Sequence, residues 1–314
     1  MKRILVYILG ACLMFSCSRL PVPDRSPETV DVDLSVEMYG IEMEGSPASK
    51  ALTPLDPSVE NSISNLWILQ YAQDGRLTQA YYIDKDYVNP SGERPLERPV
   101  LSISLNVTLS KGPNSTIVIV ANMGEANSTD PDWPSSGEFK WGEHGGGSLY
   151  DLQKKLFVCS LDDHQMPHLF MSGITELDVD DDTKALPVNV MLSRLASKFK
   201  VTIRSASANT YSNVRLQMLN CPSKMSIFPN EVSFNAAEDL FTMTQQVCGQ
   251  GEYLNSEKSF FFYANENLSS APELQTLIKV VADQGGQEVS TTLKPSTHGT
   301  TFRNTYYDIQ ISLK

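Results

Sequence analysis

The side chains that could hold a metal ion or perform catalysis are few and scattered. His164 and His168 are four residues apart, a spacing that can seat a metal when it lies on a helix. Two carboxylates, Asp162 and Asp163, precede them. Pro167 lies between the histidines and argues against a helix, because proline removes a backbone donor and clashes with the preceding turn. We therefore interpret this stretch as a surface loop and expect no metal there.

Two other short runs have the composition of ion-binding loops. One is acidic and contains Asp178, Asp180, Asp181 and Asp182. It could attract calcium, but it lacks the glycine and the distal glutamate of an EF-hand loop, so a solvated linker is favoured. The other, Gly145 to Ser148, opens a predicted helix and could hold an anion there. It has no P-loop lysine, so a flexible turn is the default interpretation.

Signatures of known enzymes are missing from the sequence. No GxSxG elbow and no HExxH pair occurs, and no cysteine is accompanied by a recognised catalytic signature. We therefore expect a protein that is not an enzyme and that uses no cofactor.

Two tryptophans stand out as candidates for ligand contact. Trp133 and Trp141 lie in a stretch rich in Gly, Pro and Ser, which predicts an exposed loop. Aromatic side chains anchor many interfaces, so the pair could contact a sugar or a partner protein. Loop tryptophans more often cap a small core, and that alternative stays open.

The composition is that of a folded, acidic protein. Of 314 residues, 41% are hydrophobic and 20% are charged, so the chain can bury a sizeable core. At roughly 150 residues per domain, this length favours two domains. The net charge of −12 disfavours nucleic acid as a partner, because most of the surface would repel a phosphate backbone. Beyond the first 16 residues, no apolar run approaches the roughly 20 residues that a membrane-spanning helix needs.

The N-terminus has the features of a bacterial export signal. Lys2 and Arg3 precede an apolar run from Ile4 to Phe15. A small residue followed by Cys17 ends this run, which resembles a lipoprotein signal, in which the cysteine is acylated and becomes the new N-terminus. Cys12 also follows a small residue, but the apolar run before it is shorter, so Cys17 is the preferred lipidation site. An ordinary secretory signal with an incidental cysteine is the alternative.

The remaining cysteines do not form a disulfide framework. Cys159, Cys221 and Cys248 are odd in number and show no CxxC spacing, which argues against a zinc ribbon as well. A bridge between Cys221 and Cys248 stays open, and buried free thiols are the preferred interpretation.

Apolar residues recur at every second position through most of the chain, which is typical of β-strands with one buried face. The clearest case has Val30, Val32, Leu34, Val36 and Met38 alternating with polar residues. The other predicted strands are Leu66–Tyr71, Gln79–Ile83, Leu101–Leu109, Thr116–Ala121, Val188–Leu192, Phe199–Arg204, Val214–Leu219, Ser259–Tyr263, Leu277–Val281, Glu288–Leu293 and Tyr306–Ser312. One helix is predicted, Leu149–Phe157, with Ser148 as its N-cap. Short strands in this number predict an all-β fold of antiparallel sandwiches.

Composition divides the chain into four segments. Pro21 to Pro27 is a proline-rich spacer, and Glu44 to Pro57 is a polar linker that also bears proline. The acidic run is taken as the connection between two sandwiches. The predicted segments are a signal peptide, residues 1–16; a tether with the first strand and a propeptide-like part, residues 17–50; and two β-sandwich domains, residues 51–183 and 184–314.

Six short stretches resemble the landmarks of one protein family. They are Asn65–Tyr71 followed by Asp74-Gly75, Ile119–Met123, Phe170–Gly173, Leu192–Phe199, Phe262–Asn267 and Phe302–Tyr307. In this order, behind a lipoprotein-like signal, they resemble the fimbrillins, which build the protease-dependent type V pili of Bacteroidota. The resemblance covers about residues 51 to 314. It implies two transthyretin-like β-sandwich domains, export as a lipoprotein to the outer membrane, and assembly with other fimbrial subunits into a surface fibre.

The resemblance also implies a processing step. In fimbrillins a trypsin-like protease cuts after a basic residue in the N-terminal linker, and here Lys50-Ala51 stands at the matching place. Arginine is the usual residue before the cut, so lysine at this position leaves open whether the cut occurs. Loss of the strand from Val30 to Met38 would expose an apolar groove and unpaired backbone groups, which an extended segment of another subunit could fill.

The resemblance leaves the place of the subunit in the fibre open. Lys314 directly follows the last predicted strand, whereas stalk subunits carry a further donor segment, so a tip or accessory subunit is expected. An uncut anchor that keeps its lipid and first strand is the alternative. A surface lipoprotein that binds a host ligand or glycan through Trp133 and Trp141 is the rival interpretation.

Overall fold

A computed structural model describes residues 28–39, 42–43, 62–83, 101–123, 147–158, 169–206, 210–229, 237–297 and 299–314. Within these ranges the chain consists of β-strands joined by turns, with one short α-helix, α3 (Leu149–Lys154). The predicted all-β fold is therefore confirmed. None of the helices in these ranges has the length and apolar character that a membrane span requires.

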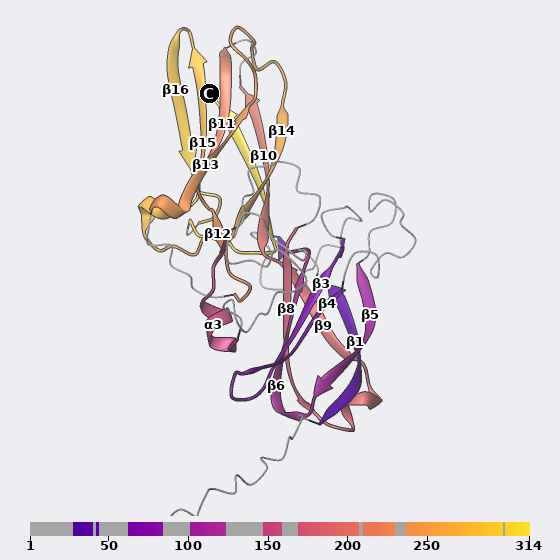
Figure 1. Ribbon diagram of the computed structural model, residues 1–314. Helices are drawn as coiled ribbons and strands as arrows, with labels where there is room; N and C mark the ends of the chain where they lie inside the picture. Colours follow the sequence, from indigo (N-terminus) through magenta and orange to yellow (C-terminus); the bar gives the residue numbers. More distant parts are fainter. Residues whose placement is uncertain are drawn as a thin grey trace, which may run out of the picture.

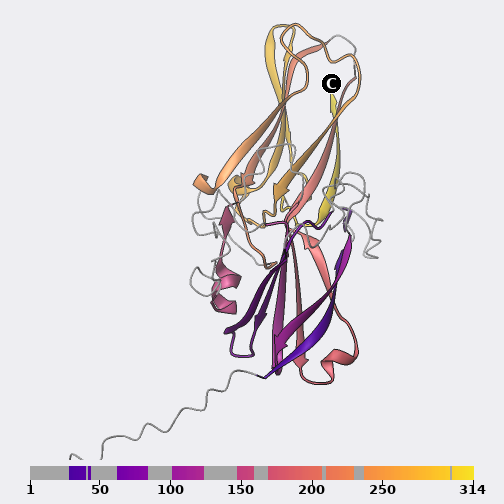
Figure 2. The same ribbon diagram turned by 45° about the vertical axis from the view of Figure 1, so that its right-hand side comes forward.

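The strands form two units that lie end to end (Figures 1 and 2). The N-terminal unit contains β1 (Thr29–Met38), β3 (Leu66–Tyr71), β4 (Leu77–Ile83), β5 (Ser102–Ser110), β6 (Gly112–Ala121), β8 (Met171–Val179) and β9 (Val188–Arg194). The C-terminal unit contains β10 (Ala196–Ser205), β11 (Tyr211–Pro222), β13 (Leu240–Gln246), β14 (Lys258–Asn265), β15 (Leu277–Gln284), β16 (Gln287–Leu293) and β17 (Thr305–Leu313). The shorter elements are β2 (Glu42–Met43), β7 (Phe157–Val158), β12 (Lys224–Met225) and the 3₁₀ turns η2 (Thr183–Ala185), η3 (Ala237–Asp239) and η4 (Pro272–Leu274).

The N-terminal unit is a sheet folded over on itself. Its strand order is β4-β3-β6-β8-β9-β1-β5, but β8 and β9 pair only at Met171 with Arg194 and at Ser172 with Ser193. Beyond these pairs the sheet opens into two layers, β4-β3-β6-β8 and β9-β1-β5. A single apolar core contains buried residues from both layers, with β1, β5 and β9 on one side and β3, β6 and β8 on the other. The layers therefore pack face to face as a sandwich.

Gly173 lies where the two layers separate. A Cβ atom at this position would come within 2.5 Å of the carbonyl oxygen of Met191 on β9. No side chain fits there without moving the backbone of β9, so this close approach of two strands requires glycine.

The C-terminal unit is a second sandwich, made from two four-stranded sheets. One has the order β14-β10-β17-β2 and the other the order β13-β11-β15-β16. Their facing sides share one core that includes Phe199, Phe262 and Tyr307. Cys221 and Cys248 are both buried in this core as free thiols, so of the two alternatives left open by the sequence the structure has the unbridged one.

Several elements differ in detail from the sequence-based expectation. The helix ends at Lys154 rather than at Phe157, because Phe157 and Val158 leave it to pair with β12 as strand β7. The predicted strands omitted β8 and β13 and the two-residue strands. Among the strand pairs in the described residues, most are antiparallel as expected, and three are parallel: β1 with β9, β10 with β17, and β17 with β2. The predicted division between residues 183 and 184 stays a prediction, and β9 beyond it pairs with strands of the N-terminal unit.

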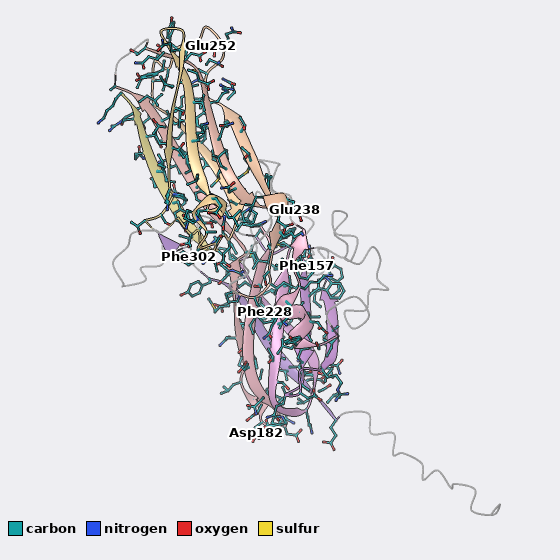
Figure 3. The ribbon with its side chains drawn as sticks, turned by 90° about the vertical axis from the view of Figure 1, so that its left-hand side faces the viewer. Phe157, Asp182, Phe228, Glu238, Glu252 and Phe302 are labelled. Carbon is teal, nitrogen blue, oxygen red and sulfur yellow. The ribbon has the colours of Figure 1, made fainter. Side chains whose placement is uncertain are left out.

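A third apolar cluster, which we call the junction cluster, lies between the two units. Strands β3 and β6 are buried on both faces, and their second face is covered by α3, β7 and residues 225–228 of the C-terminal unit. We call the region where the two units meet the waist. Figure 3 shows Phe157, Phe228 and Phe302 near it, with Asp182 and Glu252 at the two far ends of the molecule. Burial on both faces explains why the β3 sequence is almost continuously apolar rather than alternating.

Polar groups reinforce the junction cluster. The guanidinium of Arg303 donates to the carbonyl oxygens of Ile227 (3.1 Å) and Phe228 (2.9 Å) and pairs with the Glu266 carboxylate at 2.8 Å. On the other side of the waist, buried Arg194 at the end of β9 donates to Asn304 at 2.7 Å. These contacts bind Arg303 and Asn304, which directly precede β17, to both units.

We predict that Arg303→Met lowers the free energy of unfolding of the full chain by about 3 kcal/mol. The substitution removes the guanidinium that pairs with the Glu266 carboxylate and donates to two carbonyls, and leaves that carboxylate only the backbone N–H of residue 303. The side chains of Arg303 and Glu266 are only 11% and 12% exposed. Urea unfolding followed by circular dichroism is the measurement. Arg76→Met is the matched control: its pair with Asp74 spans 3.8 Å between side chains 73% and 65% exposed, so its loss should change little. Equal effects of both variants would contradict the prediction.

Candidate functional site

Strand β1 occupies the middle of the outer layer of the N-terminal unit. It pairs antiparallel with β5 from Thr29 opposite Ser110 to Glu37 opposite Ser102. On its other side, Leu34 to Met38 pair in parallel with Val188 to Leu192 of β9. No direct pairing joins β9 to β5 in the described residues, so β1 is the strand through which these two neighbours belong to one sheet.

The side chains of β1 alternate strictly between the core and solvent. The five predicted residues point inward and are almost fully buried: Val30 7%, Val32 0%, Leu34 1%, Val36 0% and Met38 7% exposed. Burial of an aliphatic side chain of this size contributes roughly 1.5–3 kcal/mol. The strand therefore covers a continuous apolar groove whose walls are β5 and β9 and whose floor is the facing layer.

The outward face of β1 is polar, and two of its carboxylates accept hydrogen bonds from β5. Asp31 accepts a hydrogen bond from Thr108 at 2.7 Å, and Asp33 accepts one from Asn106 at 2.8 Å. Exposed contacts of this kind contribute little to stability. They fix the register of β1 against β5, because a shift by one residue would place the carboxylates in the core.

The segment after β1 continues toward the C-terminal unit. The backbone N–H of Tyr39 donates to the Leu192 carbonyl at 2.7 Å. Strand β2 then pairs in parallel with β17, Glu42 opposite Thr305 and Met43 opposite Tyr306. The N-terminal segment is thus bound to both units by backbone pairing.

The arrangement of strands is found in solved proteins. A protein from Parabacteroides distasonis assigned to cell adhesion matches with a TM-score of 0.60 and 15% sequence identity. The match covers 90% of this chain and 88% of that protein. The tip fimbrial protein Mfa3 of Porphyromonas gingivalis, with a C-terminal truncation, matches with a TM-score of 0.58 and 13% sequence identity. The match covers 91% of this chain and 96% of that protein. A fimbrial assembly protein of Parabacteroides distasonis matches with a TM-score of 0.52 and 14% sequence identity, over 90% of this chain and 92% of that protein. No protein-family model and no curated protein matches the sequence.

The chain has the fold of the fimbrillins. The predicted resemblance is thereby confirmed at the level of the fold. Within this fimbrillin fold, five of the six recognised stretches contribute side chains to the junction cluster; they lie on β3, β6, β8, β9 with β10, and β14. The sixth stretch, which leads into β17, supplies Arg303. The stretches also supply other polar contacts of the cluster, including that of Ser172, whose hydroxyl donates to the Ile227 carbonyl at 2.6 Å.

Most of the other predicted site residues fall outside the described residues of this fimbrillin fold. They are Cys17, Lys50, Ala51, Trp133, Trp141, His164 and His168. The roles predicted for Cys17 in lipidation, for Lys50-Ala51 in cleavage and for the two tryptophans in ligand contact stay predictions. The expectation that the two histidines lie in a surface loop and bind no metal stays a prediction as well.

The acidic run and the helix start are local turn structures. Asp180 accepts hydrogen bonds from the Thr183 hydroxyl and from the backbone N–H groups of Asp182 and Thr183, and these bonds lower the pKa of Asp180. Ser148 accepts from the N–H of Asp151 at 3.1 Å, which confirms it as the N-cap. In the part of the chain that the structure describes, no group of three or more His, Cys, Asp or Glu side chains could hold a metal ion.

Sequence analysis missed a buried polar residue beside the groove. Gln70 on β3 is 1% exposed and faces β5 across the sandwich. Its only signal in the sequence is a polar residue inside the apolar run of β3.

We predict that Val36→Asp in β1 lowers the free energy of unfolding by more than about 3 kcal/mol, because the new carboxylate has no partner in the groove. The matched control is Ser35→Asp, one residue away on the outward face, which should change stability by about 0.5 kcal/mol or less. Thermal or urea unfolding of the full chain measures both. Similar losses for the two variants would show that β1 is not held by its inward face.

Proposed function

We propose that this chain is a non-enzymatic structural or adhesive subunit of a cell-surface fimbria. In this proposal it is exported as a lipoprotein acylated at Cys17 and held in the outer membrane. A trypsin-like protease cuts between Lys50 and Ala51, and the chain then joins other fimbrial subunits by exchange of strands. The observation that carries the proposal is the position of β1: it is the middle strand of the β9-β1-β5 layer and precedes the cut in sequence.

A cut after Lys50 would change how β1 is held. Before the cut, β1 and β2 are covalently continuous with the rest of the chain, so they re-form after any local opening. After the cut, only non-covalent contacts retain them: the backbone pairing, the five buried side chains and the exposed hydrogen bonds to β5. Another extended segment that offers apolar residues at alternate positions can then compete for the same place.

Strand addition supplies the driving force for assembly. An empty groove would expose the apolar floor of the sandwich and two rows of unpaired backbone groups on β5 and β9. A donor strand buries the floor through alternate side chains and pairs both edges, so backbone hydrogen bonds give affinity and the side-chain pattern gives specificity. The same interactions that fold the precursor would then hold two subunits together.

We propose a tip or accessory position for the subunit. Support comes from the shared fold with a tip fimbrial protein, at a TM-score of 0.58. An anchor that keeps β1 and its lipid is the alternative position, and it differs from a tip subunit in its N-terminus.

The N-terminus of the native protein tests the proposal. We expect mass spectrometry to find an unmodified N-terminus at Ala51 in chains that co-purify with fibres. Lys50→Ala should leave acylated Cys17 on the chain and abolish the association of the chain with fibres. The control Lys294→Ala removes a basic residue far from the cut in sequence and should behave like the chain without substitutions. If cells that make the chain without substitutions carry it uncut and acylated at Cys17, processing is overturned, and an anchor or a surface glycan-binding lipoprotein is favoured.

A further inference from the structure

Strand β5 forms one wall of the groove and lies at the end of its sheet. One edge of β5 pairs with β1 along nine residues. In an antiparallel ladder, successive residues direct their N–H and C=O groups alternately toward and away from the partner strand. The backbone N–H of Lys111 donates to the backbone carbonyl of Glu28, just before β1, at 2.7 Å. The backbone N–H and C=O of the neighbouring Ser110 therefore face away from β1, toward the other layer.

The side chain of Gln70 binds these two groups of Ser110. Its amide nitrogen donates to the Ser110 carbonyl at 2.7 Å, and its amide oxygen accepts from the Ser110 N–H at 2.8 Å. The same nitrogen lies 3.3 Å from the hydroxyl of Ser115 on β6. Gln70, Ser110 and Ser115 are all 3% exposed or less. The amide of Gln70 thus makes the two hydrogen bonds that a neighbouring strand would make with residue 110.

Two residues of β4 extend this contact along β5. The Tyr81 hydroxyl lies 2.5 Å from the carbonyl oxygen of Thr108, and the Gln79 amide donates to the Ser110 hydroxyl at 3.1 Å. Thr108 has the same alternation as Ser110, so its carbonyl also faces away from β1. Burial, with a smaller contribution from the Asp31 carboxylate, raises the pKa of Tyr81, so its hydroxyl stays protonated as a donor.

We propose that Gln70, with Tyr81 and Gln79, is a latch that keeps β5 in place when β1 leaves, so that the groove stays open for a donor strand. The proposal rests on the strand-exchange function above and assigns these residues a positioning role in it. All three latch residues lie on β3 and β4, which follow the cut in sequence and belong to the facing layer. Their bonds to β5 therefore do not pass through β1.

Without the latch, β5 would have little to hold it once β1 is gone. Its C-terminal end is joined to β6 through Lys111, and its inward side chains Leu105, Val107 and Leu109 touch the core. Among the described residues, no other strand pairs with it. A β5 that detached or collapsed into the groove would have to be ordered again by each incoming strand, and that ordering lowers affinity.

The test uses the full chain with the recognition sequence of a site-specific protease inserted between Lys50 and Ala51. After cleavage, the chain is loaded with an excess of a fluorescent peptide of residues 28–43, and dilution of the loaded complex gives the Kd by anisotropy. Gln70→Leu should raise this Kd about tenfold, because binding must then order β5. Tyr81→Phe, which removes a single hydroxyl, should raise it about threefold and serves if Gln70→Leu does not fold.

Ser172→Ala is the matched control, because it also removes a buried hydrogen bond of a side chain in the N-terminal unit, in this case to the Ile227 carbonyl of the other unit, and lies away from β5. It should lower the stability of the uncut chain in the same way as Gln70→Leu and leave the Kd of the peptide within about twofold. Equal Kd values for Gln70→Leu, Tyr81→Phe and Ser172→Ala would overturn the latch while leaving strand exchange intact. If the cut chain without these substitutions captures no peptide, strand exchange itself is overturned, and the latch with it.

Discussion

The N-terminal unit depends on one strand that is not held by its own chain neighbours. Strands β9 and β5 are separated by β1. Strand β5 pairs with nearly all of β1, and β9 pairs with its second half, Leu34 to Met38. The five inward side chains of β1 complete the core that the facing layer begins. Because β1 lies at the start of the chain, both its backbone pairing and its apolar contacts are long-range in sequence. The core of the N-terminal unit is therefore completed by a strand that is distant in sequence from both of its partners.

The junction cluster explains why the recognised stretches have the residues they have. Gly173 allows β8 to cross close to β9, and Arg303 bonds two carbonyls and a carboxylate at the waist. Asn304 accepts from Arg194, which joins the end of β9 to the start of β17. These residues perform backbone and junction tasks that few other side chains can perform. The resemblance to fimbrillins therefore falls on residues that join the two sandwiches in this chain, and it identifies no ligand.

Alternation alone was enough to predict β1 and the inward direction of its five apolar residues, because a strand with one wet face leaves a period of two in the sequence. Its parallel partner β9 could not be predicted, since pairing between distant segments leaves no local signal. The apolar run of β3 was read as a strand, but Gln70 within it gave no sign of its partner on β5. The two-residue strand β2 and the division of the first sheet into two layers are likewise decided by tertiary contacts.

The two walls of the groove are held by groups that lie outside it. On one side, β9 runs directly into the waist, where Arg194 bonds Asn304 and the Leu195 N–H donates to the Phe170 carbonyl at 2.8 Å. On the other side, Gln70 and Tyr81 hold the backbone of β5 against the facing layer. Neither set of contacts includes β1. Under the proposed exchange of strands, walls fixed independently of the occupant would let the groove keep its shape when one strand leaves and another enters.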